Sequence, residues 1–518
     1  MYLVAAVIAT WPAIRHADER FLGRFHRSGH GRVVPGDYLQ ANYHLWLVGH
    51  QLENGRAPWI DPYSFQPEAS PRLNFGGWPF GLPYWPVEAA FGPVIAWNLL
   101  ILLSFVAAGL FVLAWLRELG LPRGPALVGG LAFALGPYRV AQSTGHFRGP
   151  ISILLPLALW AFERSRKGSR WWLVLCGAAL GSIPFSDIHL ALAAIPFFIL
   201  YVVLRSFRRP RELLWGVVAG LGGVGASFLV AAFTIPGSIT GGGRSLQEVA
   251  VYSAEGLDFV TRHVRTGLES FVFLGWLTPL LALAGLGVLI WTKRYALAAV
   301  LGMGAIVPCL LALGTNLPLY STLWRNFPPL RFPRVPERLM PVAVLCIAAL
   351  VAFAVSKVPS RVIVPAVVLL ALFFDLHVRL YQGLFADGDN QAYAALRAQP
   401  PGRLAELPVF LPGRSEGSVY LYYDMQVSRE RPGGYSTVAP KSADETARRL
   451  RPLTCGDWSV HPKALDRLGV RYVAVHHGLF EGDVPVKPGC LRPAVQGLLD
   501  NGWRPLAAGG DVQMFVHP

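Results

Sequence analysis

The chain has 518 residues, of which 53% are apolar and only 15% are charged, and its formal net charge is +15. Soluble chains carry about 25% charged residues on average, so this sequence has too few charged groups to cover a soluble protein of its size. The basic residues lie in short segments between apolar runs, and no zinc-finger, helix-turn-helix or RNA-binding signature accompanies them, which argues against nucleic acid as a partner.

Eleven apolar segments predict membrane-spanning helices. About 20 apolar residues cross the hydrocarbon core of a bilayer, and only a helix satisfies its own backbone hydrogen bonds there. The first segment is too short to cross the bilayer alone, and we expect that the start codon is assigned too late or that the chain is a fragment. The fourth is short enough to be re-entrant instead of spanning. The predicted spans are 2–14, 93–116, 125–141, 150–163, 171–187, 189–205, 212–234, 270–291, 295–314, 339–356 and 361–377.

The short hinges between these spans predict an orientation. Alternate hinges, at 117–124, 164–170, 205–211, 292–294 and 357–361, carry fourteen Lys and Arg residues, whereas the longer opposite set carries eight. Basic residues concentrate in cytoplasmic loops. We therefore expect a multi-pass protein of the plasma membrane with a cytoplasmic N-terminus, and with residues 15–92, 235–269, 315–338 and the C-terminal region outside.

The first external loop, residues 15–92, is rich in tryptophan, phenylalanine and proline, which is typical of a segment folded at the membrane surface. Asp37 follows Pro35-Gly36 and precedes His44 and His50, which flank an apolar stretch. An aspartate after Pro-Gly is typical of a turn or a helix N-cap, so this bland interpretation of Asp37 stands beside a functional one.

Further polar residues are predicted at the outer ends of the spans. His146 and Arg148 lie at the outer end of the third span, and Asp187 and His189 lie at the outer junction of the fifth and sixth. Charged residues near membrane spans are costly and are candidates for function, although arginine and histidine also reach lipid headgroups.

A proline-rich external segment, 328–338, carries Arg331, Arg334 and Arg338. Guanidinium groups match phosphate oxygens in a bidentate fork, so this segment predicts a phosphate site, with contact to anionic lipid headgroups as the alternative.

Residues 378–518 predict a small α/β domain, because short strand-like runs alternate with helix-like stretches. Cys455 and Cys490 lie in this region, where they either form a disulfide or remain two free thiols. The strand-like runs are Leu407–Leu411, Val419–Tyr423, Arg471–His476 and Val512–Val516, and the helix-like stretches include Ala443–Arg451 and Lys463–Leu468.

Several short motifs, in their order along nearly the whole chain, resemble the GT-C-type bacterial membrane glycosyltransferases. They are Gly36-Asp37 followed by Trp46, His50, Asn54-Gly55 and Pro58-Trp59; Gly145-His146 with Leu155-Pro156-Leu157 and Glu163-Arg164; Arg334-Val335-Pro336 with Arg338; Gly434-Tyr435-Ser436 with Pro440; and Leu468-Gly469-Val470-Arg471-Tyr472-Val473. The resemblance implies a polytopic α-helical fold of about eleven spans (1–377) with a small C-terminal α/β soluble domain (378–518).

The resemblance also implies transfer of a hexosyl or pentosyl group from a polyprenyl-phosphate donor to a glycan, lipid or protein acceptor of the cell envelope. Asp37 would act as the base or orient the acceptor, and Arg334 and Arg338, with Arg331, would hold the phosphate. The family often has two acids in the first loop; here Asp61, or more weakly Glu53, would be the second. No cofactor is predicted, and a divalent cation is left open. The alternatives are a transporter or flippase of lipid-linked sugars and a non-catalytic assembly protein.

Overall fold

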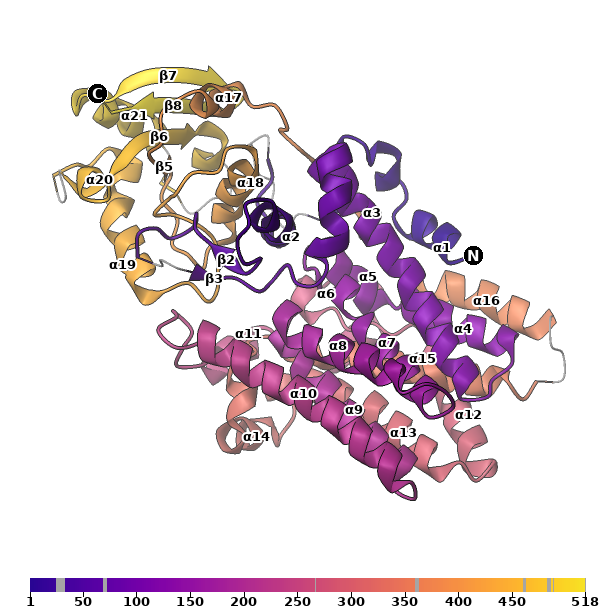
Figure 1. The fold of residues 1–518 in the computed structure, drawn as a ribbon. Coiled ribbons are helices and arrows are strands. Elements are labelled where there is room, and N and C mark those ends of the chain that lie inside the picture. The colour runs from indigo at the N-terminus through magenta and orange to yellow at the C-terminus, as the bar shows by residue number, and fades with distance from the viewer. Residues whose placement is uncertain are drawn as a thin grey trace. The chain divides into compact units, whose positions relative to one another are not determined.

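The computed structural model describes residues 1–24, 33–68, 72–265, 267–358, 363–459, 463–481, 486–487 and 489–517. Arg361, counted among the basic hinge residues, and the start of the predicted span 361–377 lie outside them. The chain forms two compact units (Figure 1). Unit 1 comprises Met1–Arg15, Asn98–Ala231 and Gly243–Tyr381, and unit 2 comprises His16–Trp97, Ala232–Gly242 and Gln382–Pro518.

Unit 1 is built from helices, with α3 running into it from unit 2. Its α-helices are α1 (Tyr2–Ala9), α3 (Gly81–Glu118), α4 (Arg123–Ala134), α5 (Pro137–Thr144), α6 (Arg148–Ile151), α7 (Leu154–Ser165), α8 (Trp171–Ser186), α9 (Ile188–Ser206), α10 (Pro210–Thr234), α11 (Leu246–Val251), α12 (Leu277–Trp291), α13 (Tyr295–Ala312), α14 (Tyr320–Asn326), α15 (Met340–Val355) and α16 (Ile363–Leu376). The short 3-10 helices η3 (Leu268–Ser270) and η6 (Pro336–Leu339) also belong to it, and η6 leads directly into α15.

Five helices in the described part of the chain are long and apolar enough to cross a membrane: α3, α9, α10, α13 and the helix Pro336–Val355. Three shorter apolar helices, α8, α12 and α16, accompany them. The helical membrane architecture predicted from the apolar runs is therefore confirmed, whereas the number of eleven spans stays a prediction.

Helix α15 is the core of unit 1, and 94% of its apolar window is buried. It contacts α4, α12 and α13. A Cβ added to Gly285 of α12 would lie 1.9 Å from the carbonyl oxygen of Leu350, and one added to Gly129 of α4 would lie 3.0 Å from that of Ala348. Small residues thus allow the close helix approach that lipid-embedded bundles need.

Prolines and one glycine decide where the apolar segments bend. Gly92 has φ +80°, which breaks α3 just before Pro93, the first residue of the predicted span 93–116. The predicted span 125–141 is wrong as a single helix, because α4 ends at Ala134 and α5 begins at Pro137. Proline has no N–H to continue the α4 ladder, but it is well suited to a helix start.

Charged residues at the C-terminal ends of α7 and α9 and at the N-terminal end of α10 form one network. Glu163 accepts hydrogen bonds from Arg205 Nε at 2.9 Å and from Arg166 Nη1 at 2.8 Å, and Arg166 Nε reaches Glu212 at 2.6 Å. These residues belong to the hinges predicted to be cytoplasmic or lie next to them. The network therefore brings two hinges that are both predicted to be cytoplasmic together at one end of unit 1.

Unit 2 combines the first loop with the C-terminal region. Its elements are β1 (Arg20–Gly23), α2 (Asp37–Glu53), β2 (Ile60–Asp61), β3 (Arg72–Leu73), β4 (Gln382–Phe385), α17 (Gln391–Arg397), β5 (Arg403–Leu407), α18 (Ser418–Gln426), α19 (Lys441–Leu450), α20 (Ala464–Arg467), β6 (Val470–His476), α21 (Leu491–Asp500), β7 (Arg504–Gly509) and β8 (Val512–Val516). The first loop and the C-terminal region join through β1 and β4, which pair antiparallel with Arg20 opposite Phe385.

The main sheet of unit 2 has the order β5-β6-β8-β7. Strands β5 and β6 are parallel, and β8 is antiparallel to both β6 and β7. Two strand predictions need correction. Val419–Tyr423 lies in helix α18, because a run buried on every side has no period that separates strand from helix. The run Leu407–Leu411 is not a strand either; β5 ends at Leu407, and Pro408 cannot donate to the ladder.

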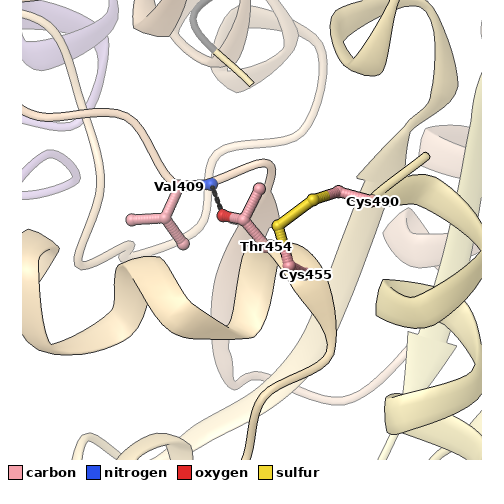
Figure 2. The surroundings of a disulfide bond; sticks show 4 residues. All are labelled: Val409, Thr454, Cys455 and Cys490. Atoms are coloured by element: carbon pink, nitrogen blue, oxygen red, sulfur yellow. Dashed lines mark hydrogen bonds between the residues drawn. A yellow bond between two sulfur atoms is a disulfide. The ribbon is translucent and has the colours of Figure 1, made fainter. Parts of the chain in front are cut away.

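Cys455 and Cys490 form a disulfide across 35 residues, which decides between the two states the sequence left open. It links the end of η8 (Arg451–Cys455) to the start of α21 (Figure 2). Next to it, Thr454 Oγ1 accepts a hydrogen bond from the backbone N–H of Val409 at 2.8 Å (Figure 2). The disulfide thereby links the two helical segments η8 and α21 beside the strand β5.

We expect removal of this disulfide to destabilise unit 2 by about 2–4 kcal/mol. Without the bond, the unfolded chain regains the conformational entropy that closing a loop of this length had removed. Limited proteolysis of the purified protein, comparing the wild type with Cys455→Ser, measures the effect as faster cleavage within residues 403–517. Cys309→Ser, which changes a free cysteine of unit 1, is the control. Equal cleavage rates in all three proteins would contradict the expectation.

Candidate functional site

The polar residues of unit 1 meet where α6, the α8–α9 junction and η6 come together. Asp187 is the N-cap of α9, and its Oδ1 accepts from the backbone N–H groups of His189 at 2.8 Å and Leu190 at 3.4 Å. Its Oδ2 accepts from Nε of Arg148. Both carboxylate oxygens are thus in use, and Asp187 fixes the position of Arg148.

Arg338 lies beside the same pair. Its Nη1 is 3.4 Å from both ring nitrogens of His189, and His189 Nδ1 is 3.1 Å from Asp187 Oδ1. Arg338 is only 8% exposed, and Glu337 before it is fully buried. Gln142 Nε2 reaches Glu337 Oε1 at 3.4 Å. We call these six residues the arginine cluster: Gln142, Arg148, Asp187, His189, Glu337 and Arg338.

Several buried polar atoms of this cluster have no hydrogen-bond partner within the described chain. They are Arg148 Nη1, Arg338 Nε, Glu337 Oε2 and Gln142 Oε1, together with the hydroxyl of the adjacent Tyr138. An unsatisfied buried polar group costs about 1–3 kcal/mol, and arginine donors suit anionic oxygens. The side chains of Arg148 and His189 remain 13% and 23% exposed. The cluster therefore combines buried arginine donors that lack partners with side chains that remain partly exposed.

The three arginines of segment 328–338 do not share one environment. Arg334 pairs with Glu269 at 3.4 Å and lies over the ring of Tyr252. Arg331 donates from Nε to the carbonyl oxygen of Trp324 at 3.2 Å and lies over the ring of the same residue. Only Arg338 belongs to the arginine cluster. His146 lies in the turn between α5 and α6, two residues before Arg148.

Arg139, which the sequence did not single out, is buried in α5 close to the cluster. Its Nη2 donates to the carbonyl oxygen of Ser104 at 2.8 Å, its Nη1 to that of Ala134 at 3.2 Å, and its Nε to Ser152 Oγ at 3.2 Å. Ala134 ends α4, so these bonds hold the break between α4 and α5. Arg139 thereby positions the helix that carries Gln142.

In unit 2, Asp37 is the first residue of α2, and the N-cap is Gly36. The hydroxyl of Tyr435 donates a hydrogen bond to Asp37 Oδ1. The carbonyl oxygen of Tyr435 accepts from Gln40 Nε2 at 2.7 Å, so α2 contacts this tyrosine twice. Asp37 is half-buried in the first turn of the helix. The carboxylate is therefore oriented by Tyr435 at a partly open position.

Asp61 has a different environment. It is fully buried and accepts from Tyr43 Oη at 2.8 Å and Ser64 Oγ at 2.6 Å, and it pairs with Arg72 at 3.3 Å. Burial opposes ionisation, but Arg72 and the hydrogen bonds outweigh it, and the pKa of Asp61 is lowered. These contacts describe a carboxylate that organises the first loop.

The two histidines of α2 are partly or largely buried. Burial, with the charge of Arg72, lowers the pKa of His44 to about 4. His50 stacks on Trp46 with ring centres 4.3 Å apart, its Nε2 is 2.7 Å from the hydroxyl of Tyr63, and burial lowers its pKa. Both histidines are thus neutral at pH 7. Across the described residues, no three His, Cys, Asp or Glu side chains gather as a metal site.

No family model and no curated protein matches this sequence. Its structure is similar to the arabinofuranosyltransferase AftD from Mycobacteria, with a TM-score of 0.55 and 14% identity over 99% of this chain and 39% of that one. It is also similar to the oligosaccharyltransferase of Archaeoglobus fulgidus in the apo form, with a TM-score of 0.54 and 13% identity over 92% of this chain and 69% of that one.

The same archaeal enzyme, AglB, solved with an inhibitory peptide and a dolichol phosphate, gives a TM-score of 0.52 at 13% identity, again over 92% of this chain and 69% of that one. At these identities the similarity establishes the fold. The chain has the fold of GT-C-type membrane glycosyltransferases, as its motifs predicted, and it spans about two fifths of the length of AftD.

Proposed function

We propose that the chain is a membrane glycosyltransferase that moves a sugar from a polyprenyl-phosphate donor to an acceptor on the extracytoplasmic face. The observation that supports this most is the arginine cluster, whose two guanidinium groups keep buried N–H donors without partners. A lipid-linked phosphate supplies the anionic oxygens that these donors lack. AglB, which has a similar fold, binds a dolichol phosphate.

In the proposed reaction, a hydroxyl oxygen of the acceptor attacks the anomeric carbon of the donor sugar. The new C–O bond forms as the bond from that carbon to the phosphate oxygen breaks, and the electron pair leaves with the polyprenyl phosphate. Asp37 takes the proton of the acceptor hydroxyl. Arg338, with Arg148, stabilises the charge that develops on the leaving phosphate. The phosphate is a good leaving group, so the step needs no general acid.

The proposed topology has eleven spans in residues 1–377 and an extracytoplasmic α/β domain in residues 378–518. Two observations within unit 2 support a shared compartment for the first loop and the C-terminal region. β1 pairs with β4, and the Tyr435 hydroxyl donates to Asp37. The disulfide Cys455–Cys490 suits the oxidising side of a membrane. Asp37 and Tyr435 would then face extracytoplasmic acceptors.

The test uses the full chain in lipid nanodiscs with a polyprenyl phosphate and the matching polyprenol, which lacks the phosphate. We expect the phosphate to bind at least tenfold more tightly, because the two arginines recognise its oxygens. With a polyprenyl-phosphate pentose or hexose and an envelope acceptor fraction, polyprenyl phosphate is released. Equal binding of both lipids would refute the phosphate site. Binding without release of polyprenyl phosphate would favour a transporter of lipid-linked sugars.

A further inference from the structure

Glu337 is a second carboxylate within the arginine cluster, and it differs from Asp187 in how it is satisfied. Asp187 uses both oxygens on Arg148 and on the start of α9. Glu337 is fully buried, its Oε1 has one long contact of 3.4 Å with Gln142, and its Oε2 has no hydrogen-bond partner among the residues that the structure describes. The cluster thus holds one tightly bound carboxylate and one that lacks strong hydrogen bonds.

The charges that face Glu337 come from several elements. Arg148 of α6, Asp187 before α9 and Arg338 of η6 act on it, as does Glu269 of η3, which pairs with Arg334. Tyr138 of α5 is coupled to Glu337, and His189 of α9 lies 3.4 Å from the neighbouring Arg338. Helices α13 and α15, which also pack against η6, contain no Asp, Glu, Lys, Arg or His.

Charge counting shows what an anionic ligand would meet. With Glu337 ionised, the two carboxylates of the cluster balance its two arginines. A phosphate that binds beside Arg148 and Arg338 then adds a negative charge next to a buried carboxylate, and like charges in such a site cannot both persist without a large cost. A protonated Glu337 removes this repulsion, and its O–H becomes a hydrogen-bond donor.

We propose that Glu337 is the proton-binding group of the donor site: it takes up one proton from solvent when the phosphate of the donor binds, and its Oε2–H then donates to a phosphate oxygen. This inference rests on the proposed function and names a further residue that recognises the donor. Arg148 and Arg338 supply the positive charge. Glu337 makes binding of the donor depend on pH, because the donor binds well only when the Glu337 side chain can be neutral.

The test measures the affinity of the full chain in nanodiscs for a prenyl phosphodiester between pH 6.5 and 9.5. A diester keeps one negative charge over this range, whereas a phosphate monoester titrates near pH 6. For the wild type we expect the affinity to fall about tenfold per pH unit above the titration of Glu337, because binding is linked to one proton. Glu337→Gln, a permanent mimic of the neutral form, keeps the wild-type low-pH affinity and loses the slope.

Glu255→Gln, which changes an exposed acid of unit 1, is the matched control and retains the slope. Calorimetry of the wild type at a pH above the titration of Glu337, in two buffers of different ionisation enthalpy, reports the proton uptake directly, and so gives the answer even if Glu337→Gln does not fold. A slope that persists in Glu337→Gln, or no proton uptake by the wild type, overturns this inference alone. No binding by the wild type at any pH overturns the proposed function as well.

Discussion

Replacing Arg338 with Gln lowers kcat/KM for a polyprenyl-phosphate sugar by about 10²–10³-fold, the expected cost of removing a preorganised donor to developing charge. Arg338 is buried, touches His189 and has a free Nε donor inside the arginine cluster. Glutamine keeps a polar side chain that can donate a hydrogen bond, but it is shorter and carries no charge. We expect kcat to fall as well as KM to rise, because the negative charge on the phosphate oxygens increases as the sugar departs.

Arg338 is a cleaner probe than Arg148, whose loss would leave Asp187 as a buried carboxylate without its ion pair and so confuse catalysis with folding. Arg325→Gln is the matched control, because Arg325 is an exposed arginine of the same predicted external segment. The assay follows release of polyprenyl phosphate from a radiolabelled donor, with the melting temperature of each variant measured in parallel. Turnover of Arg338→Gln equal to that of Arg325→Gln would place donor binding elsewhere.

Asp37→Asn abolishes most of the sugar transfer, with an expected fall in kcat of about 10²–10⁴-fold, because the amide cannot accept the proton of the acceptor hydroxyl. The substitution preserves the size of the side chain, and its carbonyl oxygen still accepts the hydrogen bond from Tyr435. The fold of α2 should therefore remain. Donor binding, measured with the prenyl phosphodiester, should change less than twofold, since the role proposed for Asp37 is on the acceptor.

Tyr435→Phe separates the orientation of Asp37 from its chemistry. We expect a smaller fall, of about tenfold, mainly in kcat, together with a shift in the acidic limb of the pH profile, because the carboxylate loses one hydrogen bond to its charged form. Asp389→Asn changes an exposed acid of unit 2 and controls for net charge. If Asp37→Asn retains wild-type kcat, another group is the base, and a normal pH profile in Tyr435→Phe would show that the contact is only structural.

The sequence by itself determined the helical membrane architecture. Runs of apolar residues and the positions of proline are local properties, so the break before Pro93, the α8–α9 turn at Asp187 and the apolar helix α15 follow from composition and spacing. The short motifs likewise predicted the GT-C-type fold. Local patterns failed where burial removed them, as in α18, or where a proline interrupted a predicted span, as between α4 and α5.

Only the tertiary structure decided which polar residues meet. Tyr435 reaches Asp37 across 398 positions, and Gln142 reaches Glu337 across 195. Such pairs form because apolar surfaces elsewhere in the chain pack together. The spacing of the polar residues in the sequence therefore does not predict them. For the same reason Arg338 joined His189 whereas Arg334 paired with Glu269, although both arginines lie in one short segment. The backbone path through η6, four residues long, separates their two environments.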